Sequence, residues 1–235
     1  MSTNPQPDTT TGAAATVFLD AALPHVPFDG WGQATFDAAL ADSGLAPGLA
    51  VALYPRGGVD LAVAYHRRGD GLMLDELARA DLGAMRFRDR IATALRLRLQ
   101  VADPELVRRG TALFALPQHA AEGAALIWGT ADKIWTALGD TSTDANWYSK
   151  RATLSAVYTA TVVYWLGDTS DDHTATWEFL DRRIDNVMQF EKLKSNLRAN
   201  PVTRALLTGP AWLAARIRAP GRVSDDLPGH ISDPR

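Results

Sequence analysis

Cysteine is absent from this chain of 235 residues. Its absence excludes disulfides, zinc–thiolate and iron–sulfur sites and a thiol nucleophile, and it fits a reducing compartment. No apolar run approaches the roughly 20 residues of a membrane-spanning helix. The amino terminus also lacks the basic start and apolar core of a signal peptide and the arginines of a transit peptide. We therefore expect the chain to stay in the cytoplasm.

Catalytic and metal-binding patterns are missing as well. The five histidines show neither His-x-x-His nor Glu-x-x-His spacing, which excludes the inward ligands of a di-iron bundle. Ser142 and Ser155 lack the glycine pattern of a nucleophile elbow, and Gly57-Gly58 is far short of a phosphate loop. Asp140 and Asp144 fit helix caps better than an acid–base pair. We expect no catalytic residue, no metal site and no enzymatic activity.

Acidic residues are missing from one long segment. Residues 192–222 contain seven Lys and Arg residues and no Asp or Glu, whereas the rest of the chain holds 17 basic and 27 acidic residues, a net charge of −10. An acidic body with a basic, apolar tail argues against DNA binding by the body and predicts an anionic partner for the tail. Anionic lipid is the leading candidate for that partner.

The tail also has the pattern of an interfacial helix. Val202, Leu206, Leu213 and Ile217 recur at spacings of four and seven, with Trp212 beside them and arginines elsewhere. Each basic residue near an anionic membrane contributes roughly 1 kcal/mol of attraction. The alternative is a helix that packs on its own body with its arginines solvated. The predicted membrane-contact residues are Arg204, Leu206, Trp212, Leu213, Arg216, Ile217 and Arg218.

Convincing period-two alternation is missing, and apolar residues recur at helical spacing, so we predict an all-α fold. Composition divides the chain into a disordered leader over 1–16, a helix-turn-helix region over 17–68, a helical body over 69–190, a basic amphipathic tail over 191–222 and a disordered end over 223–235. Helices are expected over 18–23, over 34–43, after Pro47, from Gly58 with an interruption near 69–71, from Phe87 to before Pro104, over 104–116, up to Gly139, over 144–166, and after a cap at Asp171 or Asp172.

The run Gly139–Arg151 is the most informative stretch, because it combines capping residues, two large aromatics and two cations at a helix start. Asp144 fits the position of the N-cap. Trp147 and Tyr148 then fall in the first turn and point about 100° apart, so the core face set by Tyr158 cannot take both rings. We expect at least one ring to be partly exposed, the alternative being that both are core.

Residues 35–61 resemble the helix-turn-helix of the TetR regulator family. The DNA-facing chemistry differs: Val51 stands at the recognition tyrosine, and Gly57 stands at the phosphate-binding lysine. Base readout needs polar side chains in the major groove, so we expect a degenerate helix-turn-helix and no nucleic-acid partner. Arg56 and the close match in the spacing of the helix-turn-helix positions support the alternative, a TetR-like transcription regulator that binds DNA. The matching positions are Gly44, Leu45, Ala46, Gly48, Tyr54, Pro55 and Leu61.

Four pieces between residues 116 and 186 resemble the ubiquinone biosynthesis protein Coq-nine family. They are Leu-Pro-Gln-His at 116–119, the helix 132–138, the run Gly139–Arg151 and Thr-Trp-x-Phe-Leu-Asp-Arg-Arg-Ile at 176–184. The resemblance implies a TetR-like fold that binds isoprenoid lipid in place of effector and DNA. It also implies an accessory protein that presents a prenylated quinone precursor to a partner, the demethoxyubiquinone hydroxylase.

The same resemblance implies where the partners bind. The partner-contact patch of the family falls on Trp147 and Tyr148, with Trp135 beside it, while Lys150 and Arg151 are expected to pair with acids of the partner. Bound isoprenoid lipid or quinone precursor is expected in a cavity between the helices of the body, with no other cofactor. The protein would then lie peripherally on the inner, cytoplasmic face of a membrane. The oligomeric state is left open and includes a homodimer.

Overall fold

The computed structural model describes the backbone of residues 7–199 and the side chains of residues 11–187 and 189. Within that range every regular element is a helix and none is a strand, which confirms the predicted all-α fold. The helices are α1 (Pro7–Ala22), α2 (Val26–Asp29), α3 (Gln33–Ser43), α4 (Pro47–Leu53), α5 (Gly58–Arg79), α6 (Phe87–Gln100), α7 (Pro104–Phe114), α8 (Pro117–Ala137), α9 (Ala145–Trp165), the 3₁₀ turn η1 (Asp171–His173) and α10 (Thr174–Ala199).

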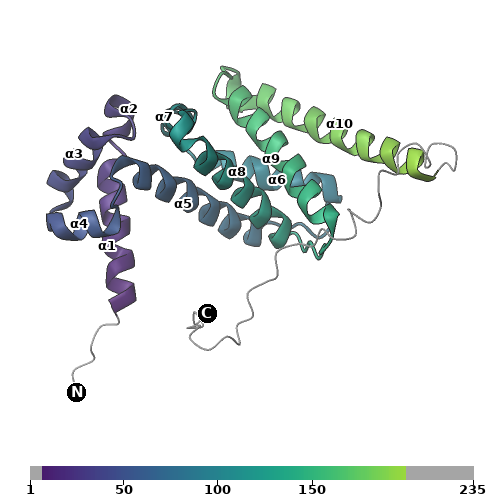
Figure 1. The fold of residues 1–235 in the computed structure, drawn as a ribbon. Helices are drawn as coiled ribbons and strands as arrows, with labels where there is room; N and C mark the ends of the chain where they lie inside the picture. Colours follow the sequence, from purple (N-terminus) through teal and green to yellow (C-terminus); the bar gives the residue numbers. More distant parts are fainter. Residues whose placement is uncertain (1–6, 200–235) are drawn as a thin grey trace.

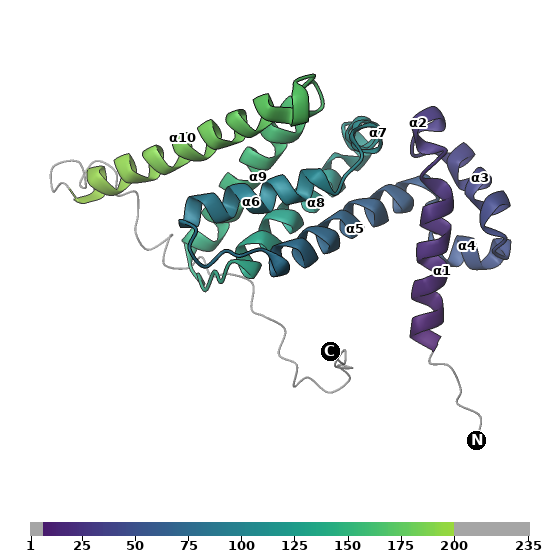
Figure 2. The same ribbon diagram turned by 180° about the vertical axis from the view of Figure 1, so that it is seen from behind.

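Two groups of helices are joined by α5. Helices α1 to α4 gather at one end of the molecule, and α5 runs from them into a bundle with α6 to α10 (Figure 1). In that bundle α9 packs against both α8 and α10, and α10 also contacts α6 (Figure 2). We call the first group the amino-terminal unit and the second, which includes most of α5, the body.

The amino-terminal unit is built around aromatic rings. The ring of Phe18 lies 5.0 Å from that of Phe36 and 5.6 Å from that of Tyr54. The Tyr54 hydroxyl donates to the carbonyl oxygen of Ala15 at 2.8 Å. Residues 7–16 belong to α1, so our prediction that they are disordered is wrong. The segment is rich in alanine, which favours helix, and Ala15 packs against this core.

The helix-turn-helix forms as the sequence predicts. Gly44 ends α3 with a φ of 65°, the left-handed conformation that a C-cap glycine adopts readily. Pro47 then opens α4 in its first turn, where its missing N–H leaves no helical hydrogen bond unmade.

The predicted interruption of α5 does not exist. The helix runs without a break through Gly69 and Gly71. A Cβ atom on Gly69 would lie 2.7 Å from Nη1 of Arg98, so this glycine allows the close approach of an arginine from α6. The glycine therefore reflects a contact between helices, which the sequence alone does not reveal.

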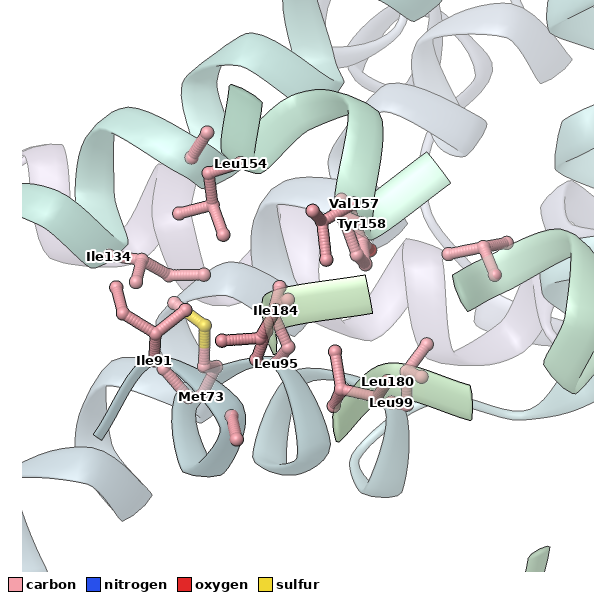
Figure 3. Packing of buried hydrophobic residues seen from close by; sticks show 14 of the residues in the cluster. Met73, Ile91, Leu95, Leu99, Ile134, Leu154, Val157, Tyr158, Leu180 and Ile184 are labelled. Atoms are coloured by element: carbon pink, nitrogen blue, oxygen red, sulfur yellow. The ribbon is translucent and has the colours of Figure 1, made fainter. Parts of the chain in front are cut away.

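The body has a continuous apolar core. Buried side chains from α5, α6, α8, α9 and α10 meet in it (Figure 3). Figure 3 labels its members Met73, Ile91, Leu95, Leu99, Ile134, Leu154, Val157, Tyr158, Leu180 and Ile184.

Helix α10 begins differently from our prediction. Asp168, which precedes η1, accepts from the backbone N–H and the hydroxyl of Thr176, and Ser170 Oγ accepts from the backbone N–H of Ala175. The hydrogen bonds from Thr176 and Ser170 hold the pKa of Asp168 well below its usual range. The predicted caps Asp171 and Asp172 are wrong, since both lie inside η1.

The predicted tail falls mostly beyond the described residues. Residues 191–199 continue α10, and the predicted membrane-contact residues, from Arg204 to Arg218, lie outside the part of the chain that the structure describes. None of the helices found between residues 7 and 199 has the length and apolarity to cross a bilayer.

Candidate functional site

A cavity of about 270 Å³ opens in the body between α5, α7, α8 and α9. Its walls are mostly apolar, and α6 contributes Arg98. The cavity thus lies between helices of the body, where we expected bound lipid. We call it the α7–α8 cavity. Its apolar walls include Leu106, Val107, Phe114, Ala124, Ile127 and Val162, and its polar side chains include Tyr65, His66, Arg98 and Tyr158.

A charged cluster centred on a buried carboxylate contributes His66 and Arg98 to the polar wall of this cavity. The Asp70 carboxylate, whose side chain is 2% exposed, receives Nε of Arg98 at 2.9 Å, Oγ1 of Thr130 at 2.8 Å and Nζ of Lys133 at 2.8 Å. Burial favours the neutral acid, but His66, Lys133 and Arg98 outweigh it and lower the pKa of Asp70. We call these five residues the Asp70 cluster. Arg98 itself is 3% exposed.

His66 is the titratable member of the Asp70 cluster that faces the α7–α8 cavity. Its Nε2 lies 2.9 Å from Oγ1 of Thr130. Burial and the nearby charge of Arg98 lower the pKa of His66 to about 4. The imidazole is therefore neutral near pH 7, while the single carboxylate of Asp70 pairs with both Arg98 and Lys133. The cavity thus combines apolar walls with a polar wall that offers hydrogen-bonding groups.

The start of α9 forms as the sequence predicts. Asp144 is the N-cap, and its carboxylate accepts from the backbone N–H of Asn146 at 2.9 Å. Trp147 is half-buried and Tyr148 is 37% exposed, which confirms that the core does not take both rings.

A third ring joins Trp147 and Tyr148. Trp128 of α8 lies 5.9 Å from the Trp147 ring and 6.4 Å from the Tyr148 ring, and the last two rings meet edge to face at 4.8 Å. We call these three residues the aromatic patch. Sequence reasoning missed Trp128, although its spacing of seven from Trp135 places both on one side of α8.

Trp135 lies on another side of α9 from the aromatic patch. Its Nε1 donates to the carbonyl oxygen of Lys150 at 3.1 Å, and Nζ of Lys150 lies 5.1 Å from the ring. The ring of Phe87 from α6 completes this contact at 5.4 Å. Trp135 is therefore held to α9 from a different direction than Trp147 and Tyr148.

Arg151 is buried and serves the fold of this end of the body. Its guanidinium pairs with Asp140 at 2.8 Å and Asp132 at 2.6 Å, and it lies 4.0 Å from the centre of the Trp147 ring. Only 2% of the Arg151 side chain is exposed. Our prediction that Arg151 pairs with acids of a partner is therefore wrong, because its guanidinium is buried and already forms ion pairs with Asp132 and Asp140.

Asp140 is the centre of this second charged cluster. Besides Arg151 it binds Nζ of Lys150 at 2.7 Å and the hydroxyl of Ser142 at 2.8 Å. Burial favours its neutral form, but the hydrogen bonds from Lys150, Arg151 and Ser142 prevail and hold the pKa of Asp140 well below its usual range. Asp140 is thus a buried ion-pair centre and not the helix cap that we predicted. We call Asp132, Asp140, Ser142, Lys150 and Arg151 the Asp140 cluster.

A second cavity, of about 290 Å³, lies beside this cluster between α6, α9 and α10. We call it the α9 cavity. Its polar rim holds Ser142, Asn146, Ser149, Lys150 and Thr153, and its apolar floor holds Phe87, Ile91, Leu154, Val157, Ile184 and Val187 (four of the floor residues are labelled in Figure 3).

The helix that would read DNA in a regulator presents apolar side chains to solvent. In α4, Leu49 is 41% exposed and Val51 is 54% exposed. Arg56, which supported the alternative of a DNA-binding regulator, forms ion pairs with Asp60 at 2.5 Å and with Glu122 of α8 at 2.8 Å. The basic residue nearest to the recognition helix is therefore committed to two carboxylates.

The described side chains contain no group of three or more histidine, aspartate and glutamate residues placed to hold a metal ion.

Comparison with solved structures shows the fold. The crystal structure of a TetR transcriptional regulator from Nitrosomonas europaea superposes with a TM-score of 0.61, and the match covers 74% of this chain and 97% of that one. The two sequences are 17% identical, so the likeness concerns the fold alone. The predicted TetR-like architecture is confirmed.

Comparison of sequences shows the family. The COQ9 family model matches residues 120–191, which contain three of the four motifs that resemble the Coq-nine family. The mitochondrial ubiquinone biosynthesis protein COQ9 of Drosophila melanogaster is 31% identical over 204 residues, 84% of this chain and 62% of that protein. The Rattus norvegicus protein of the same name is 30% identical over 211 residues, 81% of this chain and 67% of that protein. The chain spans about three fifths of the length of its Drosophila and Dictyostelium discoideum relatives. It belongs to the COQ9 family.

Proposed function

We propose that this chain is a lipid-binding accessory protein of ubiquinone biosynthesis, which presents a prenylated quinone precursor to a partner hydroxylase. The observation that carries the proposal is the α7–α8 cavity, a largely apolar space inside a TetR-like body that belongs to the COQ9 family. The relatives are named for ubiquinone biosynthesis, and the substrates of that process are prenylated and nearly insoluble in water.

The α7–α8 cavity suits an isoprenoid chain. Burial of apolar surface contributes about 25 cal/mol per Å², so each isoprene unit that enters from water adds to the affinity. The neutral imidazole of His66 and the guanidinium of Arg98, which pairs with Asp70, place hydrogen-bonding groups on one wall of an otherwise apolar space. This combination favours an amphipathic lipid.

The aromatic patch suits a protein partner, for which the demethoxyubiquinone hydroxylase is our candidate. Interface hot spots are enriched in Trp and Tyr, and the patch offers three such rings near the α8–α9 turn. Lys150 keeps 36% of its side chain exposed on the first turns of α9, which also carry Trp147 and Tyr148, so a contribution to docking stays part of the proposal. In this role the chain supplies binding and orientation, while the partner supplies the chemistry.

The basic tail is the proposed attachment to the membrane. Its seven cations and interspersed apolar residues suit the anionic inner face of a bilayer, on the cytoplasmic side. Attachment of this kind would place the body where it can take a lipid from the bilayer.

Native mass spectrometry of the purified full-length chain tests the proposal. We expect bound prenyl quinone or another apolar ligand on the wild-type protein. Ala124→Phe, which fills the α7–α8 cavity, should remove most of that ligand, whereas Ala125→Phe, an exposed neighbour outside the lining, should retain it. Protein that is empty in all three forms would contradict lipid binding.

The second candidate function is a TetR-like regulator. The observation in its favour is the superposition with the Nitrosomonas europaea regulator. The apolar surface of α4 and the pairing of Arg56 weigh against it, because phosphate contacts by free cations supply most of the affinity for DNA.

A further inference from the structure

The α9 cavity is built along one face of α9. Asn146, Ser149, Thr153 and Val157 recur at spacings of three and four, so they form a single stripe that faces α6 and α10. The first two turns of the stripe are polar and the later turns are apolar. The cavity therefore changes from a hydrogen-bonding mouth to a hydrocarbon floor over a short distance.

The mouth holds hydrogen-bond donors that the fold leaves available. Lys150 Nζ has three N–H groups, of which Asp140 and the Ser142 hydroxyl account for two. Arg88, on the α6 wall, buries an Nε that has no hydrogen-bond partner among the described residues, although Asp89 lies 3.3 Å away. Buried donors without partners are rare in proteins, so the Nε of Arg88 favours a ligand that brings an acceptor oxygen.

The cations at the mouth are already neutralised. Lys150 pairs with Asp140, and Arg88 pairs with Asp185 of α10. A phosphate or carboxylate would meet no unbalanced positive charge here and would lose its hydration, which is unfavourable for a charged group. The mouth therefore suits a neutral acceptor such as a ring carbonyl, hydroxyl or methoxy oxygen.

The floor accepts a short branched hydrocarbon. Leu154, Ile184 and Val187 lie opposite the polar mouth with Ile91 of α6 (Figure 3 shows Ile91, Leu154 and Ile184). The volume of about 290 Å³ is near the lower end of small-molecule sites, which begin at about 300 Å³. It suits one ring with the first part of a chain and not a long lipid.

We propose that the α9 cavity is a second ligand site, which takes the oxygen-substituted ring of a neutral prenyl lipid and the first unit of its chain. The proposal deepens the proposed function and rests on it for the class of ligand. Asn146 and Lys150, which line the mouth, share the first turns of α9 with Trp147 and Tyr148. A ring in this cavity would therefore contact the same turns of α9 that carry the aromatic patch on another face.

Titration calorimetry with a benzoquinone that carries one isoprene unit tests the site on the full-length protein. Thr153→Phe fills the cavity from α9, and we expect it to weaken binding at least tenfold. Ala156→Phe adds the same ring at an exposed position one turn later, outside the lining, and should change affinity less than twofold. A diphosphate ester of the same prenyl unit should bind more weakly than the quinone.

Wild-type affinity in Thr153→Phe would overturn the proposal, and so would a preference for the diphosphate. If Thr153→Phe fails to fold by circular dichroism, Ser149→Trp replaces it, since that side chain starts from an exposed position at the mouth. Loss of quinone binding in Ala124→Phe alone would place the ring in the α7–α8 cavity and refute the second site, while the proposed function stands. Quinone binding that depends on Thr153, in protein that never carries cellular lipid, would support the second site and contradict the proposed function.

Discussion

The two cores of this chain bury different chemistry. In the amino-terminal unit the described buried side chains are apolar or aromatic, with Thr35 as the polar member, whereas the rest of the described chain buries Asp70, Arg98 and Arg151. Taking a charge out of water costs several kcal/mol even when a partner is present. The amino-terminal unit is therefore stabilised in the ordinary way, by apolar packing, and the body carries charges that packing alone does not require.

The positions of the buried charges explain the difference. The Asp70 cluster contributes His66 and Arg98 to the α7–α8 cavity, and the Asp140 cluster contributes Ser142 and Lys150 to the α9 cavity. Each charged cluster thus contributes to the polar wall of one cavity. In the amino-terminal unit, by contrast, α4 exposes Leu49 and Val51 at positions where a regulator would have side chains that contact DNA bases. The comparison thus associates the buried charges with the two cavities of the body.

The strongest way to break this comparison is to remove Arg151. Arg151→Met leaves Asp140 buried with Lys150 as its remaining cation and takes the guanidinium from the Trp147 ring. We expect the free energy of unfolding to fall by about 3 kcal/mol, as is usual when one partner of a buried pair is removed. Denaturation in urea measures the change. The matched variant Arg79→Met breaks an exposed pair with Glu76 and should cost under about 1 kcal/mol. Equal losses in the two variants would contradict a special role for the Asp140 cluster.

The pH dependence of stability sharpens the comparison for the Asp70 cluster. The pKa of His66 is about 4 in the folded protein, against 6.5 for an ordinary histidine, so the unfolded chain binds the proton more tightly. Stability conferred by the neutral imidazole is complete above about pH 6.5 and is lost as the pH falls toward 4. Each pKa unit corresponds to about 1.4 kcal/mol, which gives a loss of about 3 kcal/mol. Unfolding measured from pH 7 to 4 in wild type and His66→Gln checks this, and a slope that persists in the variant would assign it to another group.

A smaller effect is expected at the aromatic patch. Tyr148→Lys should weaken association with the hydroxylase about thirtyfold, or about 2 kcal/mol, because truncated hot spots cost that much. Surface plasmon resonance with the purified enzyme measures it. Trp147→Lys should weaken association too, but it also removes the contact with Arg151 and so lowers stability.

The control for the aromatic patch comes from the amino-terminal unit. Phe28 of α2 is 83% exposed, so Phe28→Lys makes a similar change on a different surface. It should leave association with the hydroxylase unchanged. Equal losses in Phe28→Lys and Tyr148→Lys would show a charge effect and no defined patch.

Local signals in the sequence predicted most helix boundaries. Gly44 at the end of α3, Pro47 at the start of α4 and Asp144 at the start of α9 act within one turn, so their neighbours along the chain suffice to interpret them. The errors arise where a distant residue intervenes. Gly69 suggested a helix break because glycine disfavours helix. The residue that explains this glycine, Arg98, lies on another helix and cannot be recognised from the local sequence.

The candidate site was predictable only in part for the same reason. The crowding of Trp147 and Tyr148 followed from their adjacency, and the exposure of Tyr148 agrees with it. The burial of Arg151 depends on Asp132 and Asp140, which reach it through the packing of α8 on α9. Cavities are what remains when many side chains have packed, so neither their polar walls nor their volumes can be derived from spacing along the chain.

The smallest effect is expected at α4, where the comparison predicts that change has little consequence. Val51 is 54% exposed, so Val51→Lys should alter the free energy of unfolding by less than about 0.5 kcal/mol. Wild-type protein should not retain duplex DNA in a gel shift at low salt. One added lysine supplies one phosphate contact, so any binding by the variant should be weak, independent of sequence and lost as salt rises. A sequence-selective shift by the wild-type protein would show that the amino-terminal unit recognises DNA even though α4 lacks polar side chains. A TetR-like regulator would then be the better functional assignment for this chain.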